Sequence, residues 1–271
     1  MVSQAPPDRH EPHLQPFPAR TLEGEGDVRT SPMTPLSVRA TLGWAVAAFV
    51  IAQTAGTAAI VLWNALNGRP PFMMAAGYDG PLVALVTLVT NPVLIMLLAA
   101  VARRHAGAAP AEYLALKRFS LREFLVGFLA VALLAAGMDG ASYLAGHDIV
   151  SSFQVETYTT ARANGWLVPL LLAIVVVGPV GEEILFRGFL FRGWVTSDQY
   201  GVFAVIVISQ LWAALHVQYD WVGVAQVFLT GLVLGWTRWR SGSTLLTILL
   251  HLLVNLESTI ETVVQVGWWV P

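Results

Sequence analysis

This sequence contains no cysteine and few charged residues. The absence of cysteine excludes disulfide bonds, thiolate nucleophiles and cysteine-ligated metal sites. Only 12% of the residues are charged, about half the share that is usual in a soluble domain, whereas 56% are hydrophobic. A net charge of −2 also argues against a nucleic-acid partner. The composition therefore predicts a protein that is embedded in membrane lipid.

Apolar stretches long enough for membrane helices recur along the chain. A spanning helix needs about 20 predominantly apolar residues. Seven stretches approach this length, at residues 40–66, 80–102, 122–145, 164–187, 202–217, 220–238 and 243–266. The ten-residue alternating segments of a membrane β-barrel do not occur. We therefore predict an all-α fold, a polytopic transmembrane helical bundle of about seven spans, with eight as the alternative count.

The chain divides into three predicted regions. Residues 1–36 are rich in Pro, Glu, Arg, Thr and Ser and lack apolar periodicity, which predicts a disordered cytoplasmic tail. The first apolar run starts near Ala40 and is too long for a signal peptide, so we expect it to remain as a membrane anchor. Residues 37–163 are predicted to form N-terminal transmembrane helices, and residues 164–266 a four-helix transmembrane core.

The positions of the basic residues predict the orientation of the bundle. When the spans are threaded alternately with the N-terminal tail inside, 13 of the 15 basic residues fall in inner segments. Only Arg69 and Arg162 fall in outer segments. By the positive-inside rule, the chain is predicted to be an integral, multi-pass membrane protein with a cytoplasmic N-terminus.

The fourth apolar stretch ends in three ionisable residues, Glu182, Glu183 and Arg187. A charge at membrane depth costs roughly 2.5–3.5 kcal/mol on insertion scales, which makes these residues candidates for a functional site. Glu183 and Arg187 are four residues apart and share a helix face, whereas Glu182 is rotated by about 100°. This spacing predicts that Arg187 pairs with Glu183 and that Glu182 serves proton transfer. The alternative is a solvated charge cluster at the membrane interface beside Arg192.

Further polar residues occur in the later spans. His216 follows Trp212 by four residues, and Asn255 follows His251 by four, so each pair shares a helix face. A lone polar residue in a span usually forms a hydrogen bond between helices. Together with the acid pair, however, these residues predict a polar site inside the membrane.

Three arrangements would bring Glu182 and His216 to the same depth in the membrane. His216 lies about 20 Å along the fifth span, whereas Glu182 is expected near the inner end of the fourth. The two can meet if the fourth helix bends at Pro179, if the fifth is tilted or starts late, or if Glu182 lies deeper than expected. Pro179 itself fits either a water-accessible pocket or an ordinary packing kink.

Three motifs in this order carry a family resemblance: Glu-Glu-x-x-x-Arg, then aromatic-x-x-x-His, then His-x-x-x-Asn. From about Trp166 to Gln265 the chain resembles the CAAX protease and bacteriocin-processing (CPBP, or Abi) family of intramembrane endopeptidases, which is related to type II CAAX prenyl endopeptidases. Arg187 is followed by Gly188, as in the family. Trp212 stands where the family more usually has Phe, a conservative change in a pocket wall.

The resemblance implies a hydrolase of the bacterial cell membrane that cleaves a membrane-associated peptide, either CAAX-like or a leader peptide. It implies that Glu182 is the general base and that His216 holds the attacking water. His251 and Asn255 would then donate hydrogen bonds to the oxyanion, a task that suits an imidazole and a carboxamide. Supporting positions would be Glu183, Arg187 and Trp212.

Two alternatives stand beside this interpretation. Two histidines and a glutamate are a common first shell for catalytic zinc, so Glu182, His216 and His251 would be the ligands of a metalloprotease. The sequence has no His-Glu-x-x-His motif, and we favour water activated by glutamate without a cofactor. The alternative to an enzyme is a membrane scaffold, an immunity protein or a small proton-coupled transporter, since these also place ionisable groups in spans.

Overall fold

The computed structural model describes residues 36–70, 78–105, 109–195 and 197–267. Within these ranges the chain forms helices and contains no β-strand, which confirms the predicted all-α fold. The tail predicted for residues 1–36 lies outside the described residues except for its last position, and its predicted disorder stays a prediction.

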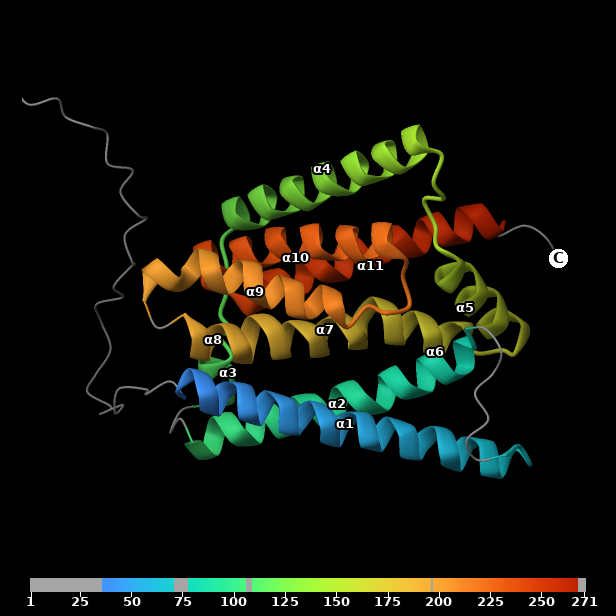
Figure 1. Cartoon of the computed structure of the whole chain (residues 1–271), viewed down its shortest axis with the longest axis horizontal. Coiled ribbons are helices and arrows are strands. Elements are labelled where there is room, and N and C mark those ends of the chain that lie inside the picture. The colour runs from blue at the N-terminus through green and yellow to red at the C-terminus, as the bar shows by residue number, and fades with distance from the viewer. Residues whose placement is uncertain (1–35, 71–77, 106–108, 196, 268–271) are drawn as a thin grey trace, which may run out of the picture. The chain divides into compact units, whose positions relative to one another are not determined.

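Five helices of the described residues are long and apolar enough to cross a membrane. They are α1 (Val38–Leu66), α2 (Gly80–His105), α4 (Leu121–Ala145), α11 (Thr244–Val266) and a continuous helix from Leu167 to Trp194. The last one comprises α6 (Leu167–Leu171), η1 (Leu172–Val177), α7 (Gly178–Glu183), η2 (Ile184–Leu190) and α8 (Phe191–Trp194), and we call it the α6–α8 helix. All five run along the length of the bundle (Figure 1).

The remaining two predicted spans correspond to α9 (Gly201–Ala214) and α10 (Trp221–Ser241). With 14 residues, α9 is about 21 Å long, which is less than the roughly 30 Å of a hydrocarbon core. The fifth span was predicted to run to residue 217, whereas α9 ends at Ala214 and the chain turns back into α10. The predicted count of about seven is roughly compatible with the five long apolar helices together with α9 and α10.

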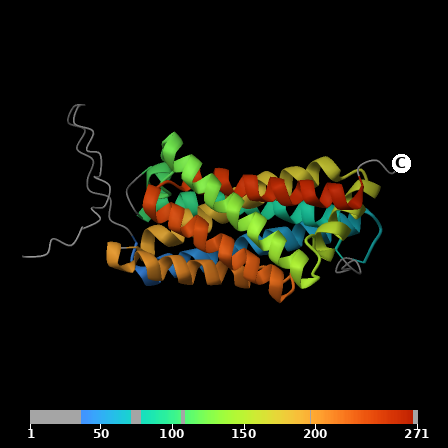
Figure 2. The same ribbon diagram turned by 90° about the horizontal axis from the view of Figure 1, so that it is seen from above.

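Three short helices connect the longer ones, namely α3 (Pro110–Tyr113), α5 (Ser152–Ala163) and η3 (Asp198–Tyr200). Apolar periodicity did not predict α5, since this helix is largely polar. Its start is fixed by a capping box, in which Ser151 and Gln154 satisfy each other's backbone N–H groups. The helix packs against the start of α2, where a side chain on Gly80 would collide with the backbone of Thr157. Figure 2 shows it at the same end of the bundle as the C-terminus of α11.

The α6–α8 helix continues beyond Arg187, where the predicted span ended, as far as Trp194. Glu182 therefore lies further from the end of this helix than the sequence predicts. Glu182 lies about 18 Å along the helix from Trp194, and His216 lies about 21 Å along the chain from Val202 in α9. Because α8 and the start of α9 lie side by side (Figure 1), Glu182 and His216 come to the same level of the bundle.

Candidate active site

Pro179 disturbs the α6–α8 helix without breaking it. The six residues before Gly178 form a π-helical turn, in which a carbonyl accepts from the N–H five residues on. The carbonyl of Ile174 would then pair with residue 179, but a proline has no N–H. The side chain of Asn255 fills this position, because its Nδ2 donates to the Ile174 oxygen at 2.8 Å. Asn255 therefore braces the helix from α11 and still has a second Nδ2 hydrogen.

A second π-helical stretch, Ile184–Leu190, follows the acid pair. The carbonyl of Arg187 lies in this stretch and accepts from Nε of Arg238 at 2.9 Å. Arg238 is itself buried and also contacts the hydroxyl of Thr244 at 3.1 Å. Polar side chains of α10 and α11 therefore bind backbone oxygens of both π-helical stretches, and this holds the acid pair between two anchored segments.

Glu183 is fully buried and bonded on two sides. Its Oε1 accepts from Nη1 of Arg187 at 2.9 Å and lies 3.0 Å from Nδ1 of His251. This contact confirms the Glu183–Arg187 pairing that the i, i+4 spacing predicts. It contradicts the alternative of a solvated interfacial cluster, because neither Glu183 nor Arg187 exposes any side-chain surface. An uncompensated charge at such a position would be strongly destabilising.

Arg187 is also held by α9 and α10. Its Nη2 donates to the carbonyl of Gly231 at 3.2 Å, and its guanidinium lies 4.5 Å from the ring centroid of Trp212. A side chain at Gly231 would meet the ring of Trp212 at 3.0 Å and Cβ of Ser209 at 2.9 Å. The glycine therefore allows the close approach through which the Arg187 charge is satisfied.

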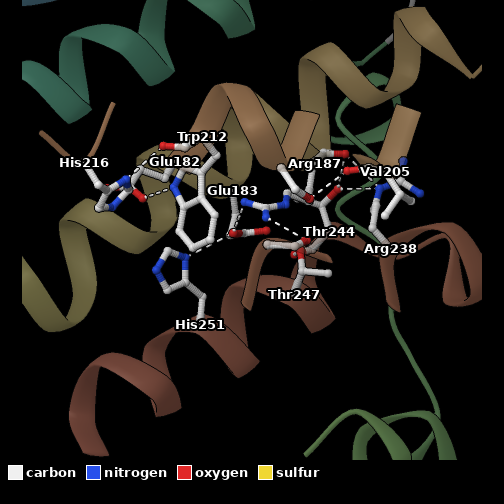
Figure 3. A network of polar contacts seen from close by, with 12 residues as sticks. Glu182, Glu183, Arg187, Val205, Trp212, His216, Arg238, Thr244, Thr247 and His251 are labelled. Carbon is white, nitrogen blue, oxygen red and sulfur yellow. Dashed lines mark hydrogen bonds and ion pairs between the residues drawn. The ribbon is translucent and has the colours of Figure 1, made fainter. Parts of the chain in front are cut away.

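Glu182 points away from this buried pair and toward α9, as Figure 3 shows. Its Oε2 accepts a hydrogen bond of 2.6 Å from Nε1 of Trp212, and its side chain is partly exposed to a cavity. The indole of Trp212 contacts both histidines, with ring centroids 5.1 Å from His216 and 5.2 Å from His251 and each pair of rings nearly perpendicular. The two neighbouring glutamates thus occupy different environments, as their helical spacing predicts.

The hydrogen bonds of the two histidines fix which ring nitrogen carries a hydrogen. Nδ1 of His216 lies 2.9 Å from the carbonyl oxygen of Trp212, and a carbonyl can only accept, so Nδ1 is the donor. Nδ1 of His251 donates in the same way to the Glu183 carboxylate. In the neutral rings, Nε2 of each histidine therefore carries a lone pair.

The candidate residues line one cavity of about 540 Å³. Glu182, Trp212, His216, His251 and Asn255 all contribute to its wall, so the structure brings the predicted site residues together. The described lining also contains six carboxylates and neither lysine nor arginine; the acids are Asp139, Asp148, Glu182, Asp220, Glu257 and Glu261. Such a wall favours positively charged groups in the cavity.

Tyr219 is a member of this wall that the sequence analysis missed. Its ring stacks on His216 at an interplanar angle of 10°, with centroids 6.0 Å apart. Its phenol hydroxyl is a potential hydrogen-bond donor in the wall of the cavity that Glu182 also lines. Arg238 and Gly231 were also missed, because nothing in the sequence links them to the acid pair.

The proposed zinc ligands do not converge in this arrangement. Among the described residues, the group whose potential ligand atoms all lie within 4.8 Å of one another is Asp139, Glu257 and Glu261. The potential ligand atoms of Glu182, His216 and His251 do not all lie within this distance of one another. The side chains as placed therefore do not fit a shared metal ion.

Comparison with known proteins identifies the segment that carries the site. Over 84 residues, 30% of this chain, the sequence is 36% identical to an Escherichia coli protein described as an uncharacterized 24.3 kDa protein. The chain spans about two fifths of the length of that relative, 39%. No solved structure matches. Residues 164–256 match the family described as type II CAAX prenyl endopeptidase Rce1-like. This match confirms the resemblance that the three motifs predict.

Proposed function

We propose that this chain is an intramembrane endopeptidase that hydrolyses a peptide bond of a membrane-associated peptide with water activated by Glu182. The observation that carries the proposal is the division between the two acids. Glu183 is buried and committed to Arg187 and His251, whereas Glu182 lines the cavity with a single hydrogen bond from Trp212. The Rce1-like match of residues 164–256 supports a protease.

In the proposed reaction, Glu182 accepts a proton from a water molecule as the water oxygen attacks the carbonyl carbon of the scissile bond. The carbonyl oxygen becomes an oxyanion in the tetrahedral intermediate. When the intermediate collapses, the carbon–nitrogen bond breaks, and the proton held by Glu182 passes to the leaving nitrogen. Proton transfer by a positioned side chain is typically worth 10²–10⁴-fold in rate.

The histidines have complementary tasks in this proposal. Nε2 of His216 accepts a hydrogen bond from the water and holds it beside Glu182, since Nδ1 is bound to the Trp212 carbonyl. His251, when its ring carries both hydrogens, donates from Nε2 to the oxyanion while Glu183 compensates the charge at Nδ1. Asn255 contributes its remaining Nδ2 hydrogen to the same oxyanion and keeps the helix braced through Ile174.

The proposal places the protein in a bacterial cell membrane with its N-terminus in the cytoplasm.

The proposed reaction includes no metal ion. It requires a base beside a bound water molecule, and Glu182 is this base. A metal-dependent reaction would instead require Glu182, His216 and His251 to converge. Adding a strong chelator to the purified protein distinguishes the two, because the proposed reaction continues unchanged and a metal-dependent one stops.

The test compares the wild-type protein with Glu182→Gln, which keeps the size of the side chain but removes the base. Both are expressed in a bacterial host, and new peptide N-termini in the membrane fraction are compared by mass spectrometry. A farnesylated CAAX peptide and its unprenylated form serve as probes in vitro. The matched control is Glu112→Gln, because Glu112 is exposed and lies outside the cavity.

We expect Glu182→Gln to lose cleavage by about 10²-fold or more while the control retains it. The membrane proteome then shows termini that depend on Glu182. Full activity of purified, folded Glu182→Gln would refute the proposed mechanism. Identical sets of termini in both strains would favour a scaffold without catalysis.

A further inference from the structure

Basic residues gather at one end of the helical bundle. At this end, which we call the basic end, α1 and α4 begin and α2, α8 and α10 end (Figure 1). At the opposite end, which we call the far end, α1, α4 and α11 end and α2 begins. Nine described basic residues lie at the basic end: Arg39, Arg103, Arg104, Lys117, Arg118, Arg122, Arg192, Arg238 and Arg240. The far end has only Arg69 and Arg162 among the described residues.

The cavity of the candidate active site extends only toward the far end. Its wall comes from the start of α2, the C-terminal half of α4, α5, the α6–α8 helix up to Glu182, the end of α9 with its connection to α10, the N-terminal half of α10, and α11 from His251 onward. Its exposed members mark the mouth and all lie in these connections or beside them: His147, Asp148, Ile149, Ser152 and Asp220.

Toward the basic end the cavity is closed, because the α6–α8 helix is packed against its neighbours there. Glu182 is the last residue of the α6–α8 helix that lines the cavity. Every residue from Glu183 to Phe191 is buried, including the Arg187 side chain and the fully buried Phe189. Arg238 is 5% exposed and seals this region from α10. A peptide therefore has no route to Glu182 from the basic end in this conformation.

Together, the charge distribution and the cavity assign a side of the membrane to the site. The positive-inside rule places the basic end in the cytoplasm and the far end outside it. We infer that substrate reaches the candidate active site from the non-cytoplasmic face. Resting on the proposed function, this inference also names a substrate class: peptide segments that lie at, or have crossed to, the non-cytoplasmic side. Soluble cytoplasmic peptides are excluded.

The absence of cysteine makes the inference directly testable, because any introduced thiol is unique. Ser152→Cys places a thiol at the mouth, and Gln218→Cys places a second one on another wall of the cavity. Arg118→Cys is the matched control, since Arg118 is exposed at the basic end. Intact cells of a bacterial host are treated with a membrane-impermeant maleimide before and after permeabilisation, and labelling in denaturant gives the total thiol.

We expect both cavity thiols to be labelled in intact cells to the same extent as after permeabilisation, and the Arg118→Cys thiol only after permeabilisation. The inference is overturned if the cavity thiols are labelled only in permeabilised cells. This holds whether or not the maleimide labels Arg118→Cys in intact cells. Having two cavity positions guards against one variant that fails to fold. The labelling is repeated in a Glu182→Gln background, because accessibility does not depend on catalysis. Failure of the proposed function would appear as cleavage by Glu182→Gln and leave the labelling pattern unchanged.

Discussion

The buried ion pair between Glu183 and Arg187 makes a quantitative prediction about stability. In Glu183→Gln, the Arg187 guanidinium keeps its hydrogen bond to the Gly231 carbonyl at 3.2 Å and its contact with the Trp212 ring at 4.5 Å. It loses the negative charge of the Glu183 carboxylate, whose Oε1 lies 2.9 Å from Nη1 of Arg187 in a site with no exposed side-chain surface. Removing one partner of a buried pair typically costs about 3–5 kcal/mol, because the remaining charge is left uncompensated.

The double variant Glu183→Leu/Arg187→Met separates charge from packing. Replacing both partners by apolar side chains of similar volume is often neutral or stabilising by about 1–4 kcal/mol. We therefore expect the free energy of unfolding to fall strongly in Glu183→Gln and to recover in the double variant. Activity should stay low in both, because His251 loses the Glu183 carboxylate that positions its ring.

The measurement is reversible denaturation of the purified protein in mixed micelles, followed by tryptophan fluorescence. Glu112→Gln serves as a control, since substitutions at exposed positions usually change stability by less than about 0.5 kcal/mol. A double variant that is less stable than Glu183→Gln would refute the reasoning. It would mean that the pair contributes through packing rather than through compensation of its charges.

Three other perturbations have defined outcomes. Gly231→Ala should lower stability by about 1–3 kcal/mol in the same denaturation assay and reduce cleavage, because its Cβ would meet neighbours at 2.9 and 3.0 Å. Asn255→Leu should lower the free energy of unfolding by about 1–3 kcal/mol, because the Ile174 carbonyl loses its hydrogen-bond donor. The loss should be smaller in a Pro179→Ala background, where residue 179 again has an N–H; equal losses in both backgrounds would contradict this explanation. In Gln218→Cys, a cationic thiol reagent should react faster than an anionic one of equal size, with the difference shrinking at high salt.

The positions of the helices were largely predictable from the sequence, because long apolar runs report directly on membrane spans. The end of the fourth span was not. Arg187 and Arg192 suggested a membrane interface there, since sequence alone shows a charge without its partner. The structure buries Arg187 against residues of α7, α9 and α10. The Arg187 charge is compensated partly by the Gly231 carbonyl, 44 residues away in the chain, and nothing in the sequence around Arg187 indicates this contact.

The sequence did not predict all the contacts of the candidate residues, although five of these residues line one cavity. The i, i+4 spacing paired Glu183 with Arg187 and separated Glu182, and both features hold. The partner of Asn255 could not be predicted, because it depends on a π-helical turn that apolar periodicity does not reveal. The oxyanion contacts of His251 and Asn255 stay predictions, as does the assignment of Glu182 as the base.

The two π-helical stretches on either side of the acid pair have a consequence for how this site tolerates change. Each wide turn holds one residue more than an α-helical path of the same length, and one residue corresponds to about 100° of rotation. Deleting a single residue from either stretch would leave a helix that still crosses the bilayer, but with its two ends turned relative to each other. The direction in which Glu182 faces is therefore set by the number of residues in these turns, so insertions and deletions there should be far more damaging than most substitutions.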